Sequence, residues 1–210
     1  FNEAGYLTKL ENNQATKSNI VITYKTNYAH LIDTITDGAG RKYYFTYTNL
    51  LLSKISYKGT GSTEITYVNF GHTGSNLTSI TDKDGKTVNY AYDDNHLLTS
   101  ATDVDGYKLS YTYNTTISTV PNRVATVTET DNSVQGGKLK IDYAHNQTTF
   151  TEILRNGSSA NQLIYQFNNW GNTVSIQDGE GRAEFARWAT DTNTSGAKGN
   201  QLSLTSKLQN

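Results

Sequence analysis

Two adjacent stretches of this sequence decide its fold, because the second repeats the first. Residues 77–93 read Leu-Thr-Ser-Ile-Thr-Asp-Lys-Asp-Gly-Lys-Thr-Val-Asn-Tyr-Ala-Tyr-Asp, and residues 97–114 read Leu-Leu-Thr-Ser-Ala-Thr-Asp-Val-Asp-Gly-Tyr-Lys-Leu-Ser-Tyr-Thr-Tyr-Asn. The Asp, Gly and first Tyr of each copy stand 21 residues apart, as Asp82 and Asp103 show. A fixed period of this size is typical of an array built from one supersecondary unit.

The same landmarks recur outside the two copies. An Asp-x-x-Gly sequence that is followed by two aromatic positions occurs at residues 37–47, 82–92 and 103–113. A degenerate copy occurs at residues 178–188. Residues 114–165 are more degenerate. We count roughly residues 5–188 as repeat, with an interruption near Pro121.

Each repeat predicts a β-hairpin. Asp-x-x-Gly is typical of a type I turn in which the Asp side chain bonds back to the backbone and the Gly accepts a positive φ. After the turn, Val88, Tyr90 and Tyr92 share one face by the two-residue period of a strand. The predicted structural turn residues are Asp37, Gly40, Asp82, Gly85, Asp103, Gly106, Asp178 and Gly181.

Consecutive hairpins predict an all-β fold: a repetitive antiparallel meander of about fifteen strands, each about six residues long. A sheet of this length twists, so we expect a coiled ribbon or half-shell. The repeat array is expected over residues 1–189. Residues 190–210 are polar and are expected to form a linker with a short terminal strand.

The composition limits what the chain can do. Its net charge of −1 argues against nucleic acid or anionic lipid as the main ligand, because phosphates would not be neutralised. No run of about 18 apolar residues exists, so no membrane span is expected. The absence of Cys excludes disulfides, thiolate catalysis and Cys-ligated zinc, and we expect no cofactor. Because Met is also absent, we expect the chain to begin inside a longer product.

The phrase Leu-x-x-Ile-x-Asp-x-x-Gly-x-x-x-x-Tyr-x-Tyr-Asp resembles the YD repeat of the Rhs family, whose naming dipeptide stands here at Tyr92-Asp93. The resemblance is strong at residues 77–114, good at 31–47 and 165–188, and partial elsewhere. It implies large secreted or surface proteins: bacterial Rhs and wall-associated proteins, shells of insecticidal toxin complexes, and animal teneurins. In these proteins, YD repeats form a β-sheet ribbon that spirals into a hollow shell, often around a C-terminal toxic domain.

The resemblance therefore implies a non-enzymatic structural segment of a secreted or cell-wall-associated protein, forming part of a β-shell or scaffold for toxin delivery or presentation. Its expected partners are neighbouring repeats or domains of the same polypeptide and an enclosed toxin domain. The Asn- and Tyr-rich composition is similar to that of the wall-associated proteins of Firmicutes, so a Gram-positive source is expected. The family's self-cleaving core ends in a stretch with Asp-Pro, whereas the single proline here, Pro121, follows Val120, so this segment lacks that protease.

Other residues that could take part in catalysis or metal binding are better explained as turn residues. His30 and His96 each precede a Leu that opens a strand, and their shared position predicts turn residues. Asp93 and Asp94 could serve as the carboxylate pair of a glycosidase, but adjacent acids are common in hairpin loops and no catalytic motif is present. In the Asp-x-x-Gly turns the Gly arrives too early for a calcium loop, which favours a plain turn. A weak calcium site shared by stacked turns is the alternative.

The tyrosines admit two interpretations. The Tyr pairs of the two copies are expected on adjacent strands in one register, where their rings could stack across the ladder as a structural aromatic face. The alternative is a carbohydrate-binding adhesion module, in which flat rings beside Asn, Asp and Thr stack on cell-wall polysaccharide. The candidate glycan-stacking residues are Tyr90, Tyr92, Tyr111, Tyr113, Trp170 and Trp188.

Overall fold

The protein is all-β, as the repeat predicted, in a computed structural model that describes residues 1–12, 19–58, 63–115, 122–189 and 199–207. These residues form 17 strands, and every strand pair is antiparallel. The chain divides into two compact units, residues 1–92 and 93–210. No helix among the described residues is long and apolar enough to cross a membrane.

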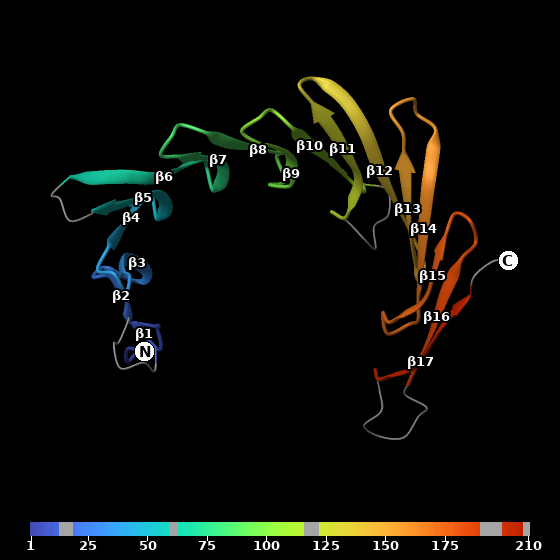
Figure 1. Cartoon of the computed structure of the whole chain (residues 1–210), viewed down its shortest axis with the longest axis horizontal. Helices are drawn as coiled ribbons and strands as arrows, with labels where there is room; N and C mark the ends of the chain where they lie inside the picture. Colours follow the sequence, from blue (N-terminus) through green and yellow to red (C-terminus); the bar gives the residue numbers. More distant parts are fainter. Residues whose placement is uncertain (13–18, 59–62, 116–121, 190–198, 208–210) are drawn as a thin grey trace. The chain divides into compact units, whose positions relative to one another are not determined.

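The first unit is a meander in which each strand pairs with the next one in the chain (Figure 1). Its strands are β1 (Lys9–Glu11), β2 (Asn19–Lys25), β3 (Tyr28–Thr36), β4 (Lys42–Thr48), β5 (Leu51–Lys58), β6 (Glu64–Thr73), β7 (Asn76–Asp82) and β8 (Thr87–Tyr92).

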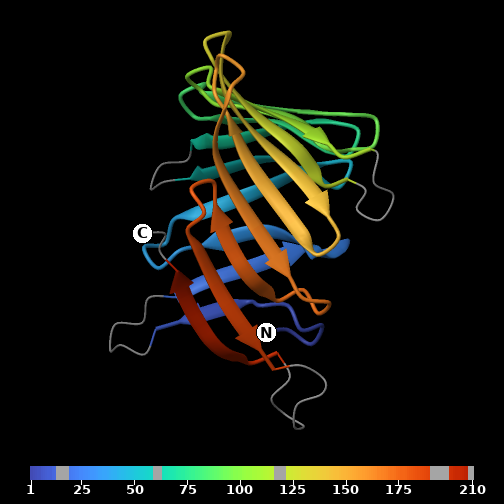
Figure 2. The same cartoon turned by 90° about the vertical axis from the view of Figure 1, so that its right-hand side faces the viewer.

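The second unit repeats this plan from β9 to β17, and Figure 2 shows β12, β13 and β14 side by side, in yellow and orange. Its strands are β9 (Leu98–Thr102), β10 (Lys108–Tyr113), β11 (Val124–Asp131), β12 (Val134–Ala144), β13 (Gln147–Ile153), β14 (Ser159–Phe167), β15 (Thr173–Asp178), β16 (Ala183–Trp188) and β17 (Gln201–Lys207).

The turn at Asp82 shows why these hairpins form. Oδ1 of Asp82 accepts the backbone N–H groups of Asp84 and Lys86, each at 2.9 Å, and the N–H of Gly85 donates to the Asp82 carbonyl at 3.1 Å. Gly85 has a φ of 82°, the left-handed conformation that closes a type I turn with a bulge. The same two side-chain bonds recur in the turns that begin at Asp37, Asp93, Asp103, Asn168 and Asp178.

Each unit is a single layer of sheet, because a strand contacts only the strands to which it is hydrogen-bonded. Among the described residues, Ala189 is the one buried hydrophobic residue. The other buried side chains carry small hydroxyl groups: Thr34, Ser56, Ser100, Thr151 and Ser175. Neither unit therefore has the apolar core that two packed layers would enclose.

The predicted meander is confirmed, with 17 strands where about fifteen were expected. The assignment of His30 to a turn was wrong: it lies in β3, while His96 does occupy a turn, with a φ of 63°. The polar C-terminal stretch includes β17, which pairs with β16. The expected interruption at Pro121 and the linker residues 190–198 lie outside the described residues.

Candidate functional site

The aromatic residues at the strand ends bridge gaps in the sheet. The ladder between β9 and β10 stops at the pair Ser100–Ser110, although both strands continue. Beyond it, the hydroxyl of Tyr113 donates to the carbonyl of Leu98 at 2.7 Å. We call this contact an aromatic latch. In it, an aromatic side chain near the end of one strand donates a hydrogen bond to a backbone carbonyl near the start of the preceding strand.

The latch recurs in both units. Nε1 of Trp188 donates to the carbonyl of Thr173 at 2.6 Å, where the β15–β16 ladder has stopped at Ser175–Phe185. The hydroxyls of Tyr24 and Tyr143 donate to the carbonyls of Leu7 and Val124 in the same way. These aromatic groups satisfy backbone carbonyls that the short ladders leave unpaired, which is a structural task.

Tyr113 stands seven residues after the Gly of its turn. Burial raises the pKa of its hydroxyl, with the charge of Asp93 as a second cause. Burial is also the first cause that raises the pKa of Tyr47, which holds the equivalent position in β4. Both phenols therefore stay protonated and able to donate at neutral pH.

The expectation that the tyrosine pairs of the two copies lie on adjacent strands was wrong. β8, which carries Tyr90 and Tyr92, pairs with β7, and β10, which carries Tyr111 and Tyr113, pairs with β9 and β11. None of these four rings is in a ring–ring contact among the described residues. Each repeat contributes two strands, so equivalent residues of successive repeats are never on neighbouring strands.

The six candidate glycan-stacking residues do not form one group. Tyr90 and Tyr92 belong to the first unit, and the other four belong to the second. Trp170 is half exposed in the turn between β14 and β15, whereas the indole N–H of Trp188 is occupied by a latch. Stacking of glycans by these residues stays a prediction.

Two of the turns carry an ion pair across the loop. Nε of Arg182 donates to Oδ2 of Asp178 at 2.5 Å, and Nε of Arg41 donates to Oδ2 of Asp37 at 2.7 Å. The hydrogen bond from Arg182 lowers the pKa of Asp178. At Asp37, partial burial acts to raise the pKa of the carboxyl. The hydrogen bonds from Arg41 outweigh it, so the pKa of Asp37 is also lowered.

Of the acidic residues considered for catalysis or calcium, Asp82, Asp93 and Asp103 accept backbone N–H groups of their own turns. Oδ1 of Asp93 accepts the N–H groups of Asn95 and Leu97, each at 2.9 Å, and so closes the turn that precedes β9. Within the described part of the chain, no group of three or more His, Cys, Asp or Glu residues gathers to hold a metal ion.

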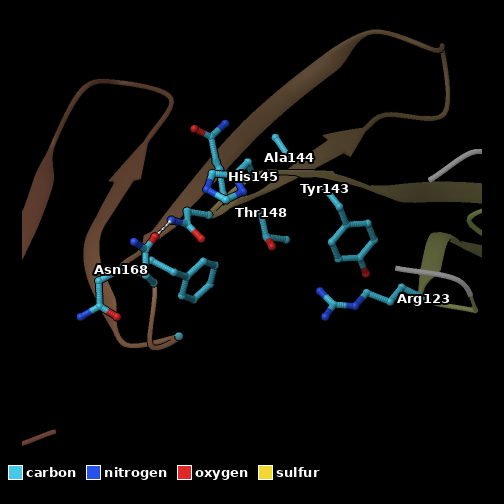
Figure 3. A pocket seen from close by; sticks show the side chains of 11 residues that line it. Arg123, Tyr143, Ala144, His145, Thr148 and Asn168 are labelled. Atoms are coloured by element: carbon cyan, nitrogen blue, oxygen red, sulfur yellow. Dashed lines mark hydrogen bonds between the residues drawn. The ribbon is translucent and has the colours of Figure 1, made fainter. Parts of the chain in front are cut away.

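A pocket of about 730 Å³ opens in the second unit at one end of the hairpins (Figure 3). It is lined by the β12–β13 turn, the β14–β15 turn and Arg123, which precedes β11. Figure 3 shows Thr148 between Tyr143 on one side and Asn168 on the other. The guanidinium carbon of Arg123 lies 5.3 Å from the centroid of the Tyr143 ring.

Bonds between the two turns shape this pocket. Nδ2 of Asn146 donates to Oδ1 of Asn169 at 2.8 Å, and the backbone N–H of Phe167 donates to the Asn146 carbonyl at 2.8 Å. Asn146 adopts a φ of 55°, a left-handed conformation that Asn tolerates. Sequence reasoning missed Arg123, Asn146 and Asn169, because no spacing rule joins them, and the first two also lie in the degenerate part of the repeat.

The chain resembles large proteins in its fold alone. It matches crystal structures of TcdB2-TccC3 without its hypervariable C-terminal region (12% identity, TM-score 0.62, 90% of this chain), of TcdB2-TccC3-Cdc42 (12%, 0.63, 85%) and of TcdB2-TccC3-TEV (13%, 0.61, 84%). In each case it spans 10% of the other chain. No curated protein matches it.

The sequence pattern itself identifies the repeat. Residues 73–108 match the RHS Repeat family, and they contain the hairpin with the turn at Asp82 and the next turn, at Asp103. This region overlaps residues 77–114, where the YD-type resemblance was strongest. Over residues 73–108 the resemblance is confirmed, since these residues match the RHS Repeat family.

Proposed function

We propose that this chain is a non-enzymatic structural segment of a larger RHS-repeat protein, in which it forms part of a β-sheet wall. The main support for this proposal is that each unit is a single layer of sheet. Among the described residues, Ala189 is the one buried hydrophobic residue, and no second layer packs on either unit. Because domains are stabilised by burying apolar surface between layers, we infer that other parts of the intact protein cover one face.

The sheet edges support further repeats as partners. Within the described residues, β1 pairs only with β2 and β17 only with β16. β17 presents Leu202 and Leu204, 54% and 61% exposed, beside an open row of backbone donors and acceptors. An edge of this kind is stabilised when another strand pairs with it, so neighbouring repeats of the same polypeptide are the proposed partners.

Toxin delivery or presentation is the finer part of this proposal. It is supported by the fold likeness to TcdB2-TccC3 and by the YD-type pattern, which implies a secreted or surface protein with an enclosed toxic domain. A Gram-positive cell-wall location is supported by the absence of Cys and the abundance of Asn, Thr and Tyr alone.

Two experiments test the structural role. Purified chain assayed against cell-wall glycans, peptides and esters should show no turnover; turnover abolished by Asp93→Asn, which keeps the turn's Oδ1 acceptor, would reject it. In the intact polypeptide, protease cleavage within this segment should be at least about tenfold slower than in the isolated chain, because covered edges open less often. Equal cleavage rates would show that nothing covers the segment.

A further inference from the structure

An apolar groove crosses the second unit on one face of the strands from β12 to β16. Leu139, Phe150 and Leu163 line a cavity of about 620 Å³, and Leu163 and Ile176 line an adjoining cavity of about 220 Å³. The ring of Phe150 packs edge-on against that of Tyr165, with the two centroids 5.6 Å apart. Because the cavities share Leu163, their apolar side chains form one continuous floor, which we call the β12–β16 groove.

The strand register places acidic side chains on the same face as this floor. Phe150 stands opposite Leu163, and Leu163 stands opposite Asp178 in the next strand. Ile176, two residues before Asp178, has Glu184 as its partner in β16. Side chains two residues apart in a strand, and partners across a ladder, point to the same side of a sheet. The apolar floor and these carboxylates therefore share one face.

The groove carries an excess of negative charge. The carboxylates that line the two cavities are those of Glu152, Asp178, Glu180 and Glu184. Among the described residues, Arg182 is the one cation in their walls. Its guanidinium is already paired twice, with Asp178 at 2.5 Å and with Glu180 at 3.1 Å. Two carboxylates are left over.

These two carboxylates, Glu152 and Glu184, have no ion pair among the described residues. Each is held by a neutral donor instead: Glu152 accepts the amide of Asn161 at 2.6 Å, and Glu184 accepts the hydroxyl of Ser206 at 3.2 Å. They lie on β13 and β16, three strands apart, which is about 14 Å or more. One cationic side chain therefore cannot pair with both.

The opposite face of the same strands has a different character. Lys140 stands opposite Thr151 and Asp142 opposite Thr149, all on the side away from Phe150. The charges there are matched within the chain, since Nζ of Lys140 lies 2.9 Å from Oδ2 of Asp142. Unmatched negative charge beside an apolar floor is therefore a property of the groove face.

We propose that the β12–β16 groove binds an extended polypeptide segment that carries two cationic side chains with large apolar side chains between them. The cations pair with Glu152 and Glu184, and the apolar side chains lie on Phe150, Leu163 and Ile176. Every second residue of an extended segment faces the groove, so small polar residues alternate with the binding ones. This inference rests on the proposed function, in which another part of the intact protein covers one face, and it names that face and the chemistry of its cover.

Fluorescence anisotropy on the purified chain tests the proposal with three matched peptides. The first is the labelled nonapeptide Gly-Arg-Ser-Phe-Ser-Phe-Ser-Arg-Gly. The second has citrulline, a neutral isostere, in place of both Arg, and the third has Ala in place of both Phe. The first should bind, and the other two should bind about tenfold more weakly or worse, because each loses either the ion pairs or the apolar contacts. No binding of the first peptide, or equal binding of the first two, would refute the proposal.

Variants locate the binding. Glu152→Gln and Glu184→Gln should each weaken binding of the first peptide about threefold or more, since each removes a charge but keeps an oxygen acceptor for Asn161 or Ser206. Asp142→Asn is the matched control, because it removes a carboxylate from the opposite face, and it should leave the affinity unchanged. Equal weakening in the control would mean a general charge effect and overturn the site.

Two further outcomes separate this proposal from its alternatives. If the chain associates with itself in sedimentation and the first peptide does not compete, a second copy covers the groove and the proposal fails. If the peptide does not bind but the segment is still protected from protease in the intact polypeptide, the proposed function stands and the assignment of this groove is wrong.

Discussion

The hydroxyl of Tyr113 and the carbonyl of Leu98 lie 2.7 Å apart, at a point where the β9–β10 ladder has already ended at Ser100–Ser110. Trp188 and Thr173 stand in the same relation across β15 and β16. A side chain thus replaces backbone pairing where two strands separate. We infer that the large aromatic groups crossing these gaps also cover Ser100 and Ser175, which accounts for the burial of these two side chains in a single-layer sheet.

Removing the latch hydroxyl should cost stability. Tyr113→Phe keeps the ring but leaves the Leu98 carbonyl without its donor, so the free energy of unfolding should fall by about 1 kcal/mol. Tyr92→Phe is the matched control, because the Tyr92 hydroxyl has no hydrogen bond among the described residues and its loss should change stability by less than about 0.5 kcal/mol. Denaturant unfolding of both variants measures the difference, and equal effects would deny the latch an energetic role.

The size of the residue beneath a latch should matter more than its hydroxyl. Ser100 is 8% exposed at the last pair of its ladder. Ser100→Leu should therefore destabilise the chain by about 1–3 kcal/mol through overpacking, while Ser100→Ala should change little. Thermal unfolding compares the two, and a Leu variant as stable as the Ala variant would show that nothing large covers this position.

Local chemistry explains what the sequence could predict. The Asp-x-x-Gly turns were predictable because the Asp acceptor and the left-handed Gly act within five residues of chain, as the bonds around Asp82 show. The strand alternation after each turn followed from the same repeat. His30 was misplaced because the loop before β3 departs from the repeat and ends at Asn27, which leaves His30 inside the strand.

Relations across strands were less predictable. A hairpin in each repeat already means two strands a repeat, so Tyr90 and Tyr111 should have been expected two strands apart in the chain, and the prediction that placed them on neighbouring strands contradicted the hairpin itself. The contact between Asn146 and Asn169 depends on how two hairpin ends meet, and no local pattern encodes it. The latch of Trp188 was hidden for the same reason, since its partner Thr173 is set by register.

The left-handed turn positions should reject β-branched residues. Gly85 has a φ of 82°, and a Cβ added there would meet nothing within 4 Å, so strain in the backbone alone opposes substitution. Gly85→Val should lower the free energy of unfolding by more than about 1 kcal/mol, and Gly85→Asn should cost less because Asn tolerates this region. If both variants melted like the parent, the turn geometry would be wrong.

The ion pair in the Asp178 turn should make stability depend on acid. The hydrogen bond from Arg182 lowers the folded-state pKa of Asp178, so its contribution is complete above the unfolded value of about 3.9 and is lost as pH falls through the folded pKa. Asp178→Asn keeps the Oδ1 acceptor for the N–H groups of Glu180 and Arg182, as Asn168 does in its own turn, but it removes the titrating group.

The melting temperature of Asp178→Asn should therefore lie below that of the parent at neutral pH, and the gap should narrow as the pH falls below about 4. Asp105→Asn serves as the control, since it removes an exposed carboxylate of another turn without touching Arg182. Melting curves across this pH range decide the question: a gap that stays constant, or an equal narrowing in the control, would mean that the Asp178–Arg182 pair does not couple folding to protonation.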